Sequence, residues 1–247
     1  MAEFGNGYIL GFATVVCIVS SLALAGTHSA MKPMQDLNMQ RSFQKDVLAA
    51  VGLPEDDKPL TGPDIDTLYA ERVKIVIVDR DGKVHEDKSL DDAKAALTAV
   101  KGTADAPEYL AVYERIDGDK VGAIAIPLYG RGLWGPISGF VALGADASTV
   151  TGSVFFAPAE TPGLGFEITS DWFEDQWKGK SLVDSAGASK PVKVVKGKAS
   201  EMCADDPTHC VDGVTGATLT CRGVTEMVGQ GVRFYEPYLR GLRANGG

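Results

Sequence analysis

The strongest pattern along the chain is an uncharged apolar run near the N-terminus. Phe4–Met31 contains no Asp, Glu, Lys or Arg, and Tyr8–Gly26 is almost entirely apolar or small. About 20 helical residues span the roughly 30 Å of a bilayer core. We therefore expect residues 1–31 to form a retained transmembrane anchor. The alternative is a cleaved signal peptide, but such peptides carry a basic segment before a shorter apolar core.

A second helical pattern follows the apolar run. Apolar residues recur at near-helical spacing through residues 32–53, and Gly52 and Pro54 end the pattern. We expect a stalk helix that leads off the membrane. The stretch over residues 54–63 is polar and contains proline, which is typical of a loop.

The middle of the chain consists of short strand-like runs joined by turn residues. The runs rich in β-branched or aromatic residues are Val73–Val78, Tyr109–Ile116, Val121–Ile126, Phe140–Leu143 and Val150–Phe156. A hairpin is expected at residues 79–82, and Ser89 can cap a short helix that runs to Val100. Because no βαβ alternation separates the strands, we predict an antiparallel sheet and an α+β fold for residues 54–247.

The last predicted element is an amphipathic helix over residues 220–242. Its apolar residues recur at steps of three and four, so one face can pack on the sheet. Four residues weaken the pattern and allow a break within the helix: Gly223, Gly229, Gly231 and Pro237.

Composition narrows the class of protein. The chain has 24 Lys and Arg against 33 Asp and Glu, so 24 − 33 gives a formal charge of −9. This acidity disfavours binding to nucleic acid, whose phosphates repel negative charge. A hydrophobic content of 45% with 23% charged residues excludes a wholly disordered chain. The four cysteines are too few for a disulfide scaffold.

The segment Asp212–Thr220, DGVTGATLT, has the composition of a phosphate-binding turn. Hydroxyl side chains at Thr215, Thr218 and Thr220 flank the small residues Gly216 and Ala217 just before the last helix. Small residues let a ligand approach the backbone, and the free N–H groups of a first helical turn bind phosphate. A turn that merely caps the helix with Thr is the alternative.

Two other segments have the composition of ligand-binding loops. ETPGLG, residues 160–165, places one proline and two glycines in a rigid turn whose backbone can lie against a flat ring. GRGLWGP, residues 130–136, contains Trp134, and WKGK, residues 177–180, contains Lys178. Packing in the core is the alternative for Trp134 and Trp177.

These segments resemble one family of flavoproteins. DGVTGAT matches the flavinylation signature, Asp-Gly, one variable residue, Ser or Thr, then Gly-Ala-Thr, whose last Thr carries FMN through a phosphoester. ETPGLG, GRGLWGP, WKGK and the N-terminal anchor extend the match along nearly the whole chain. The sequence is thus similar to the C subunit of the sodium-translocating NADH:quinone oxidoreductases, and to the related G subunit of Rnf complexes.

The resemblance implies a covalent cofactor and a set of contacts to it. Thr218 would carry FMN, and the FMN-binding part would cover about residues 108–247. Asp212 would hold the turn through hydrogen bonds to backbone N–H groups. The remaining residues implied to form the cofactor site are Thr215, Gly216, Ala217, Glu160, Thr161, Pro162, Gly163, Leu164, Gly165, Trp134 and Lys178. No catalytic residue and no metal ligand is expected.

The resemblance also implies a role and partners. The protein would carry electrons as one subunit of an NADH:quinone reductase that transports sodium and reduces ubiquinone. It would not be a complete enzyme, because no dinucleotide-binding glycine-rich loop follows a strand. Its partners would be other membrane subunits and a flavin transferase, with no nucleic acid. The alternatives are an Rnf-type subunit, a free-standing membrane-anchored flavoprotein and a binding or assembly protein without flavin.

The family further implies a single-pass protein of the bacterial inner membrane with its flavin domain in the periplasm. The charges disagree, because Lys32, Arg41 and Lys45 follow the apolar run and no basic residue precedes it. We follow the family, since the charge argument rests on three residues. In a periplasmic domain we expect Cys203 and Cys210 to form a disulfide, whereas their spacing around His209 fits no zinc pattern.

Overall fold

A computed structural model of the chain describes residues 5–54, 59–99 and 106–244. The chain divides into two compact units, Met1–Phe43 and Gln44–Gly247, which are described separately below.

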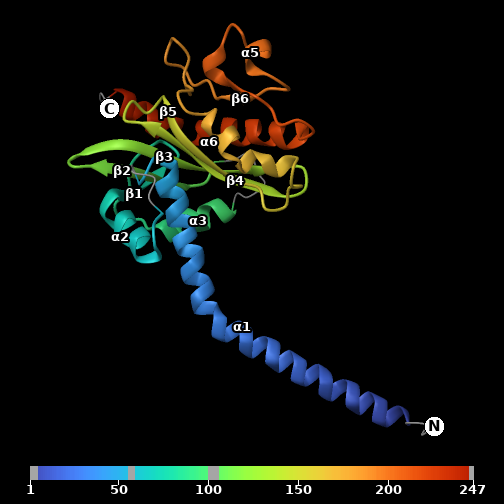
Figure 1. The fold of residues 1–247 in the computed structure, drawn as a ribbon. Coiled ribbons are helices and arrows are strands. Elements are labelled where there is room, and N and C mark those ends of the chain that lie inside the picture. Colours follow the sequence, from blue (N-terminus) through green and yellow to red (C-terminus); the bar gives the residue numbers. More distant parts are fainter. Residues whose placement is uncertain (1–4, 55–58, 100–105, 245–247) are drawn as a thin grey trace. The chain divides into compact units, whose positions relative to one another are not determined.

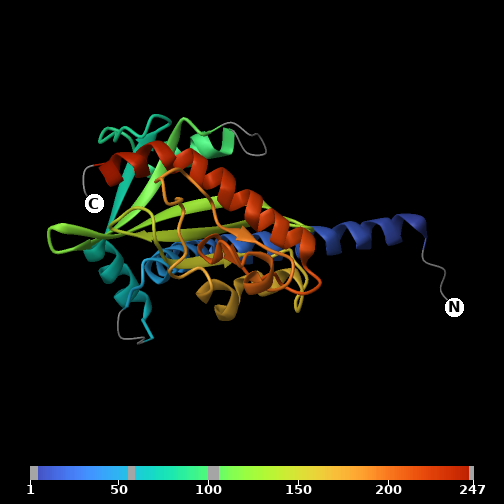
Figure 2. The same cartoon turned by 90° about the horizontal axis from the view of Figure 1, so that it is seen from above.

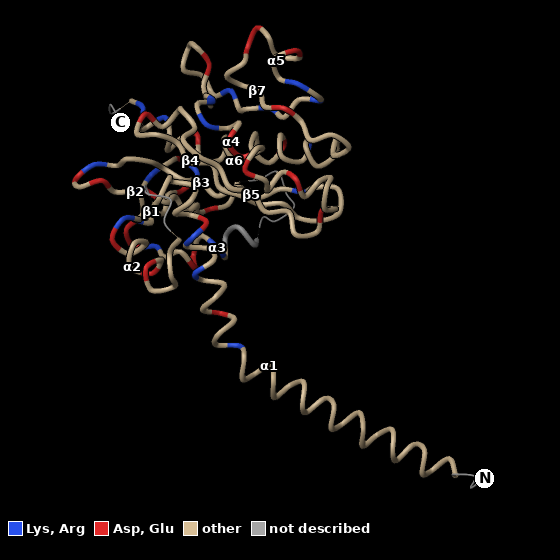
Figure 3. Tube along the Cα trace, in the orientation of Figure 1, with Lys and Arg blue, Asp and Glu red and all other residues tan. Residues whose placement is uncertain are grey.

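The first unit is helical. Helix α1 covers Asn6–Ala50 in 45 residues and passes through Pro33, so the predicted anchor and stalk form one helix. Figure 3 shows its first half without a charged residue. Among the described residues, α1 is the helix with the length and composition needed to cross a membrane.

The second unit is built on a five-stranded antiparallel sheet with the order β1-β2-β3-β4-β5 (Figure 1). The strands are β1 Val73–Asp79, β2 Tyr109–Asp117, β3 Lys120–Arg131, β4 Pro136–Gly144 and β5 Val150–Phe156. Each predicted strand is present, and all four pairings are antiparallel. The prediction of an α+β fold is therefore confirmed.

Strand β3 is longer than its sequence pattern indicates. It continues to Arg131, which pairs with Pro136, so Gly130, Arg131 and Pro136 of the GRGLWGP segment lie in strands and residues 132–135 connect them. The predicted hairpin at residues 79–82 is wrong in its extent. The chain does turn there, but no second strand follows the turn in the described residues that come directly after it; a single antiparallel bridge joins Val78 to Val84. The strand that pairs with β1 along its length is β2.

Helix α6, Thr218–Ala244, lies along one face of the sheet (Figure 2). The predicted break does not occur, because two of its glycines allow close packing instead of ending the helix. A β-carbon on Gly223 would stand 2.2 Å from the carbonyl oxygen of Arg131, and one on Gly231 would stand 2.2 Å from Leu128 Cδ2. The helix therefore lies close to β3 at these two positions.

The last turn of α1 lies against the sheet at β5. Val47, Leu48 and Ala50 are buried, and a β-carbon on Gly152 would stand 2.3 Å from the carbonyl oxygen of Ala50. The side chain of Arg115 also donates a hydrogen bond to the carbonyl oxygen of Val51 at 2.7 Å. The end of α1 is therefore part of the second unit.

The sequence pattern predicts neither helix α2, Gly62–Arg72, nor the short helices α4, Asp171–Asp175, and α5, Ala199–Met202. Helix α2 begins inside the predicted loop, because Thr61 and Asp64 form a capping box around Pro63. The short helix expected from Ser89 is α3, Leu90–Ala99; its predicted end at Val100 lies outside the described residues. The other small elements are η1 Gly165–Thr169, β6 Lys193–Val194, η2 Pro207–His209 and β7 Cys210–Val211.

Candidate functional site

Three segments that are far apart in the sequence meet at the N-terminus of α6. The turn before α6 contacts loop 160–165, since a β-carbon on Gly216 would stand 2.7 Å from Leu164 Cδ2. The end of β3 lies against the same helix, as the approach of Gly223 to Arg131 shows. The fold therefore brings together three of the four segments that the sequence singles out.

The motif turn presents Thr218 to solvent. Gly216 has φ +79°, the left-handed region that glycine tolerates. The N–H of Ala217 donates to Val214 O at 3.2 Å, and α6 then begins at Thr218. Thr215 and Thr218 are exposed, and the Thr218 hydroxyl makes no hydrogen bond to another described residue. Because the first N–H groups of a helix have no partner within it, this end of α6 suits a phosphate.

Glu160 points inward, away from solvent. Its residue exposure is 4%. Its Oε2 accepts a hydrogen bond from Thr220 Oγ1 at 2.6 Å, and its Oε1 accepts one from the backbone N–H of Trp134 at 2.8 Å. The carboxylate thus connects all three segments of the site. Thr220 belongs to the motif, but its role could not be read from the sequence without the position of Glu160.

The rest of loop 160–165 is mostly exposed. Thr161, Pro162, Gly163 and Leu164 are exposed, whereas Gly165 is buried. Gly163 has φ +75°, and its N–H donates to the carboxylate of Glu167. The exposed face of this loop is therefore available to a ligand.

The two tryptophans of the predicted segments have different environments. Trp134 is 67% exposed, so the alternative that it packs in the core is wrong and its ring is free to contact a ligand. Trp177 is fully buried, with its ring centroid 5.2 Å from that of Phe155 and 6.2 Å from that of Phe173. Trp177 is a core residue.

Lys178 does not join the site among the described residues. Its ammonium group pairs with Asp175 at 2.7 Å, and both side chains are exposed. The contact between this region and the motif is made by Gln176, whose side-chain oxygen accepts the N–H of Asp212 at 2.8 Å. The sequence carried no signal for Gln176, because its partner lies 36 residues away.

Asp212 fastens the motif to the preceding loop. Its carboxylate accepts the N–H of Ala199 and pairs with the ammonium group of Lys198, each at 2.7 Å. The hydrogen bond from Lys198, followed by that from Ala199, holds the pKa of this carboxyl below its ordinary value. The predicted bond to a backbone N–H group is present, but the donor lies outside the motif turn.

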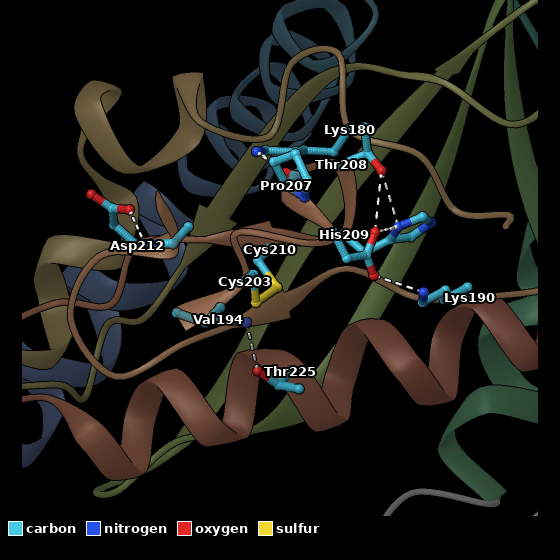
Figure 4. Close-up of a disulfide and its surroundings, with 12 residues drawn as sticks. Lys180, Lys190, Val194, Cys203, Pro207, Thr208, His209, Cys210, Asp212 and Thr225 are labelled. Atoms are coloured by element: carbon cyan, nitrogen blue, oxygen red, sulfur yellow. Dashed lines mark hydrogen bonds and ion pairs between the residues drawn. A yellow bond between two sulfur atoms is a disulfide. The ribbon is translucent and has the colours of Figure 1, made fainter. Parts of the chain in front are cut away.

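A disulfide closes the loop that Asp212 holds (Figure 4). Cys203 and Cys210 are bonded, so the predicted disulfide is present. The ring of His209 interacts with Asp206 through Nδ1 and with the carbonyl oxygen of Val183 through Nε2. His209 is therefore structural, and no group of metal-ligating side chains occurs in the described part of the chain.

These residues fit a cofactor that ends in a phosphate and carries a flat ring. The exposed hydroxyl of Thr218 and the free N–H groups of α6 suit the phosphate. Trp134 and Leu164, which is 42% exposed, provide apolar surface for the ring. The position of Leu164 against Gly216 places this apolar surface next to the phosphate end of the site.

An antiparallel sheet with such a turn at the start of its covering helix defines an FMN-binding domain, here preceded by a helix of membrane-spanning length. A family profile described as an FMN-binding domain matches residues 132–233. The chain belongs to the family of the C subunit of the Na+-translocating NADH-quinone reductase, and it is one of the subunits of that enzyme.

The assignment rests on relatives that match over most of their length. The chain is 34% identical over 231 residues to the C subunit of the Na+-translocating NADH-quinone reductase of Pseudomonas aeruginosa, covering 87% of each chain. It is 34% identical to the same protein of Haemophilus ducreyi, covering 100% of this chain and 99% of the relative. These matches decide for this family over the Rnf-type alternative.

Two crystal structures of proteins from the same family have a fold similar to that of this chain. The crystal structure of the corresponding protein from Parabacteroides distasonis superposes with a TM-score of 0.70 at 27% identity, covering 85% of this chain and 96% of that one. The crystal structure of the Shewanella oneidensis protein gives 0.67 at 31% identity, covering 82% and 97%.

Proposed function

We propose that this protein transfers electrons through an FMN bound covalently to Thr218 by a phosphoester. The observation that carries the proposal is the exposed, unbonded hydroxyl of Thr218 in the first turn of α6, within a motif that matches the flavinylation signature. FMN would fit this position because the helix N-terminus would hold its phosphate, and Trp134 and Leu164 would offer apolar surface to its ring.

Attachment needs a second protein. A Thr hydroxyl is a weak nucleophile near neutral pH, and no described residue accepts its proton. We infer that a flavin transferase supplies the base and a metal ion that polarises the phosphate of FAD. The Oγ–P bond to Thr218 forms as the P–O bond of the FAD diphosphate breaks, AMP leaves, and the hydroxyl proton passes to the transferase.

The protein's own residues then bind and orient the cofactor. The first turn of α6 neutralises part of the phosphate charge, and loop 160–165 and Trp134 form the apolar sides of the site. When bound, FMN supplies the electron-transfer chemistry, while the protein sets its position and potential. Electrons would come from and pass to other membrane subunits, which also contain the sodium path and the quinone site. The apolar core of α1, Tyr8–Gly26, has no Asp, Glu, Lys, Arg or His that could line such a path.

We place the second unit on the periplasmic side of the bacterial inner membrane, with α1 as a single-pass anchor. The disulfide Cys203–Cys210 supports this placement, because disulfides persist in oxidising compartments. Protease treatment of intact spheroplasts and of inverted vesicles tests it. Cleavage of the flavin domain in inverted vesicles alone would contradict the proposed orientation.

The covalent proposal is tested by the intact mass of the denatured protein after co-expression with a flavin transferase. We expect an increase of one FMN less one water, mapped to the peptide that contains Thr218. Thr218→Val should abolish this increase. Thr151→Val, which changes an exposed threonine of β5 outside the motif, should keep it. Flavin retained in the Thr218→Val variant would refute the assignment.

A further inference from the structure

We propose that Glu160 is a positioning residue, which fixes the first turn of α6 and thereby the direction of the Thr218 hydroxyl. This inference rests on the proposed attachment of FMN to Thr218. Its basis is the buried carboxylate that accepts hydrogen bonds from Thr220 Oγ1 at 2.6 Å and from the Trp134 N–H at 2.8 Å.

The helix connects Glu160 to Thr218. Two residues along an α-helix turn the side chain by about 200°, so Thr218 and Thr220 point in nearly opposite directions. Thr220 is 1% exposed, whereas Thr218 is exposed. A bond that holds Thr220 inward therefore sets the rotation of this turn about the helix axis, and this rotation directs Thr218 outward.

Two glycines, Gly132 and Gly165, make space for the Glu160 carboxylate. A β-carbon on Gly132 would stand 2.5 Å from Glu160 Oε1, and one on Gly165 would stand 2.3 Å from Glu160 Oε2. A side chain at residue 132 or 165 would therefore overlap the carboxylate of Glu160. Because the carboxylate is enclosed here, it is turned away from the exposed face where the ring would lie. Glu160 therefore acts through Thr220 and the Trp134 backbone, and not by contact with the cofactor.

The negative charge of Glu160 should also affect the midpoint potential of a flavin bound nearby. Its two hydrogen-bond donors are neutral groups, and it lies beside the N-terminus of α6, whose dipole favours an anion. A negative charge near a flavin opposes the addition of an electron. Glu160→Gln can keep both hydrogen bonds, because the Thr220 hydroxyl can accept from the new amide. This variant removes the charge while it preserves the geometry.

The geometry is tested by attachment kinetics in the full chain, with purified flavin transferase and FAD. Thr220→Val and Glu160→Ala should lower kcat for attachment about tenfold, because a small displacement of a reacting group has effects of at least this size. The KM for this protein as substrate should stay within about twofold of wild type. Thr220→Ser should restore the wild-type kcat. Thr225→Val removes another bonded hydroxyl of α6 and is the matched control, with an expected kcat near that of wild type.

The charge is tested by the midpoint potential of the attached flavin. Glu160→Gln should raise this potential, whereas Thr225→Val should leave it unchanged. The proposal is overturned if Thr220→Val and Glu160→Ala attach flavin at the wild-type rate, or if Thr220→Ser is as slow as Thr220→Val. An unchanged potential in Glu160→Gln would overturn the inference about the charge.

Hydrogen exchange in the unmodified protein separates this inference from the covalent proposal. We expect the amides of Cys221–Val224 to exchange several-fold faster in Thr220→Val and Glu160→Ala than in wild type. If wild type itself receives no flavin, the covalent proposal fails, but the exchange rates still test the position of α6. Unchanged exchange in both variants would show that Glu160 does not fix the turn.

Discussion

Leu164 Cδ2 lies 2.7 Å from the position that a β-carbon on Gly216 would occupy. Gly216 has φ +79°, so this residue combines a left-handed backbone with a contact that a β-carbon could make only if the Leu164 side chain moved. The two turns of the site, one before α6 and one after β5, therefore meet at a position that only glycine fits without displacement.

Gly216→Ala should destabilise the protein and slow flavin attachment. The left-handed backbone alone costs about 1 kcal/mol when Ala replaces Gly. The contact with Leu164 adds to this cost and displaces the Leu164 side chain, which forms part of the apolar surface proposed for the ring. The matched control is Gly187→Ala, because Gly187 has φ +77° but no atom within 4 Å of its β-carbon position. Denaturant unfolding and attachment rates should separate the two variants, and equal effects in both assays would contradict the role of the Leu164 contact.

Gly223→Ala should also be destabilising, by about 1–3 kcal/mol, because the new methyl group would meet the Arg131 carbonyl oxygen at 2.2 Å. In the same helix, Gly229 has no atom near its β-carbon position. Gly229→Ala should therefore stabilise the protein by about 0.5–1 kcal/mol through its better helix propensity. Thermal unfolding of the two variants gives the comparison, and effects of the same sign would show that α6 does not lie as close to β3 as described.

Glu174 should make stability depend on pH. Burial is the main cause that raises the pKa of its carboxyl to about 7; the Phe155 N–H lowers it in part, and the carboxylates of Asp171, Asp175 and Asp46 raise it further. In the unfolded chain this pKa is about 4.5. Between these values the folded protein holds a proton that the unfolded chain has lost. The contribution of Glu174 to stability therefore falls as the pH rises from about 4.5 to about 7.

Glu174→Gln should remove this contribution. The free energy of unfolding of wild type minus that of the variant should decrease as the pH rises through this window and become level above it. Glu201→Gln, which changes an exposed carboxylate, is the control. A wild-type minus Glu174→Gln difference that does not change between about pH 5 and about pH 8 would contradict the prediction.

Replacing both Cys203 and Cys210 by Ser should lower the free energy of unfolding by about 2.5 kcal/mol. A disulfide restricts the unfolded chain, and this figure corresponds to a closed loop of roughly eight residues. Cys17→Ser, which changes an exposed free cysteine, is the control. Chemical unfolding with and without reductant measures the effect. If reductant also lowered the free energy of unfolding of the double variant, the effect of reductant on wild type could not be assigned to the Cys203–Cys210 disulfide.

Trp134 should become less accessible to solvent, and so less readily oxidised, when flavin is attached to Thr218. Its ring is 67% exposed beside the motif turn, so a flavin on Thr218 would cover part of it. Trp172, at 46% exposure, lies in α4 and serves as an internal control. Hydroxyl-radical footprinting before and after attachment should show reduced oxidation at Trp134 and little change at Trp172. Equal oxidation of Trp134 in both states would place the ring elsewhere.

The sequence by itself determined the elements whose signal is local. The apolar run, the five strand runs and the spacing of the last helix each follow from side-chain periodicity within one segment, and the structure contains all of them. The turn before α6 was also readable, because small residues and hydroxyls precede the helical pattern, whereas its use as a phosphate site stays a prediction.

Tertiary structure alone decided what the glycines and the buried polar residues do. Gly223 and Gly231 indicate a break when α6 is considered alone, but they allow the helix to lie on β3. Glu160 belongs to a loop that suggests contact with a ligand, yet its carboxylate bonds Thr220, 60 residues away. Such roles depend on which segments approach one another closely, and that distance is set by packing of the whole sheet and helix rather than by neighbours in the chain.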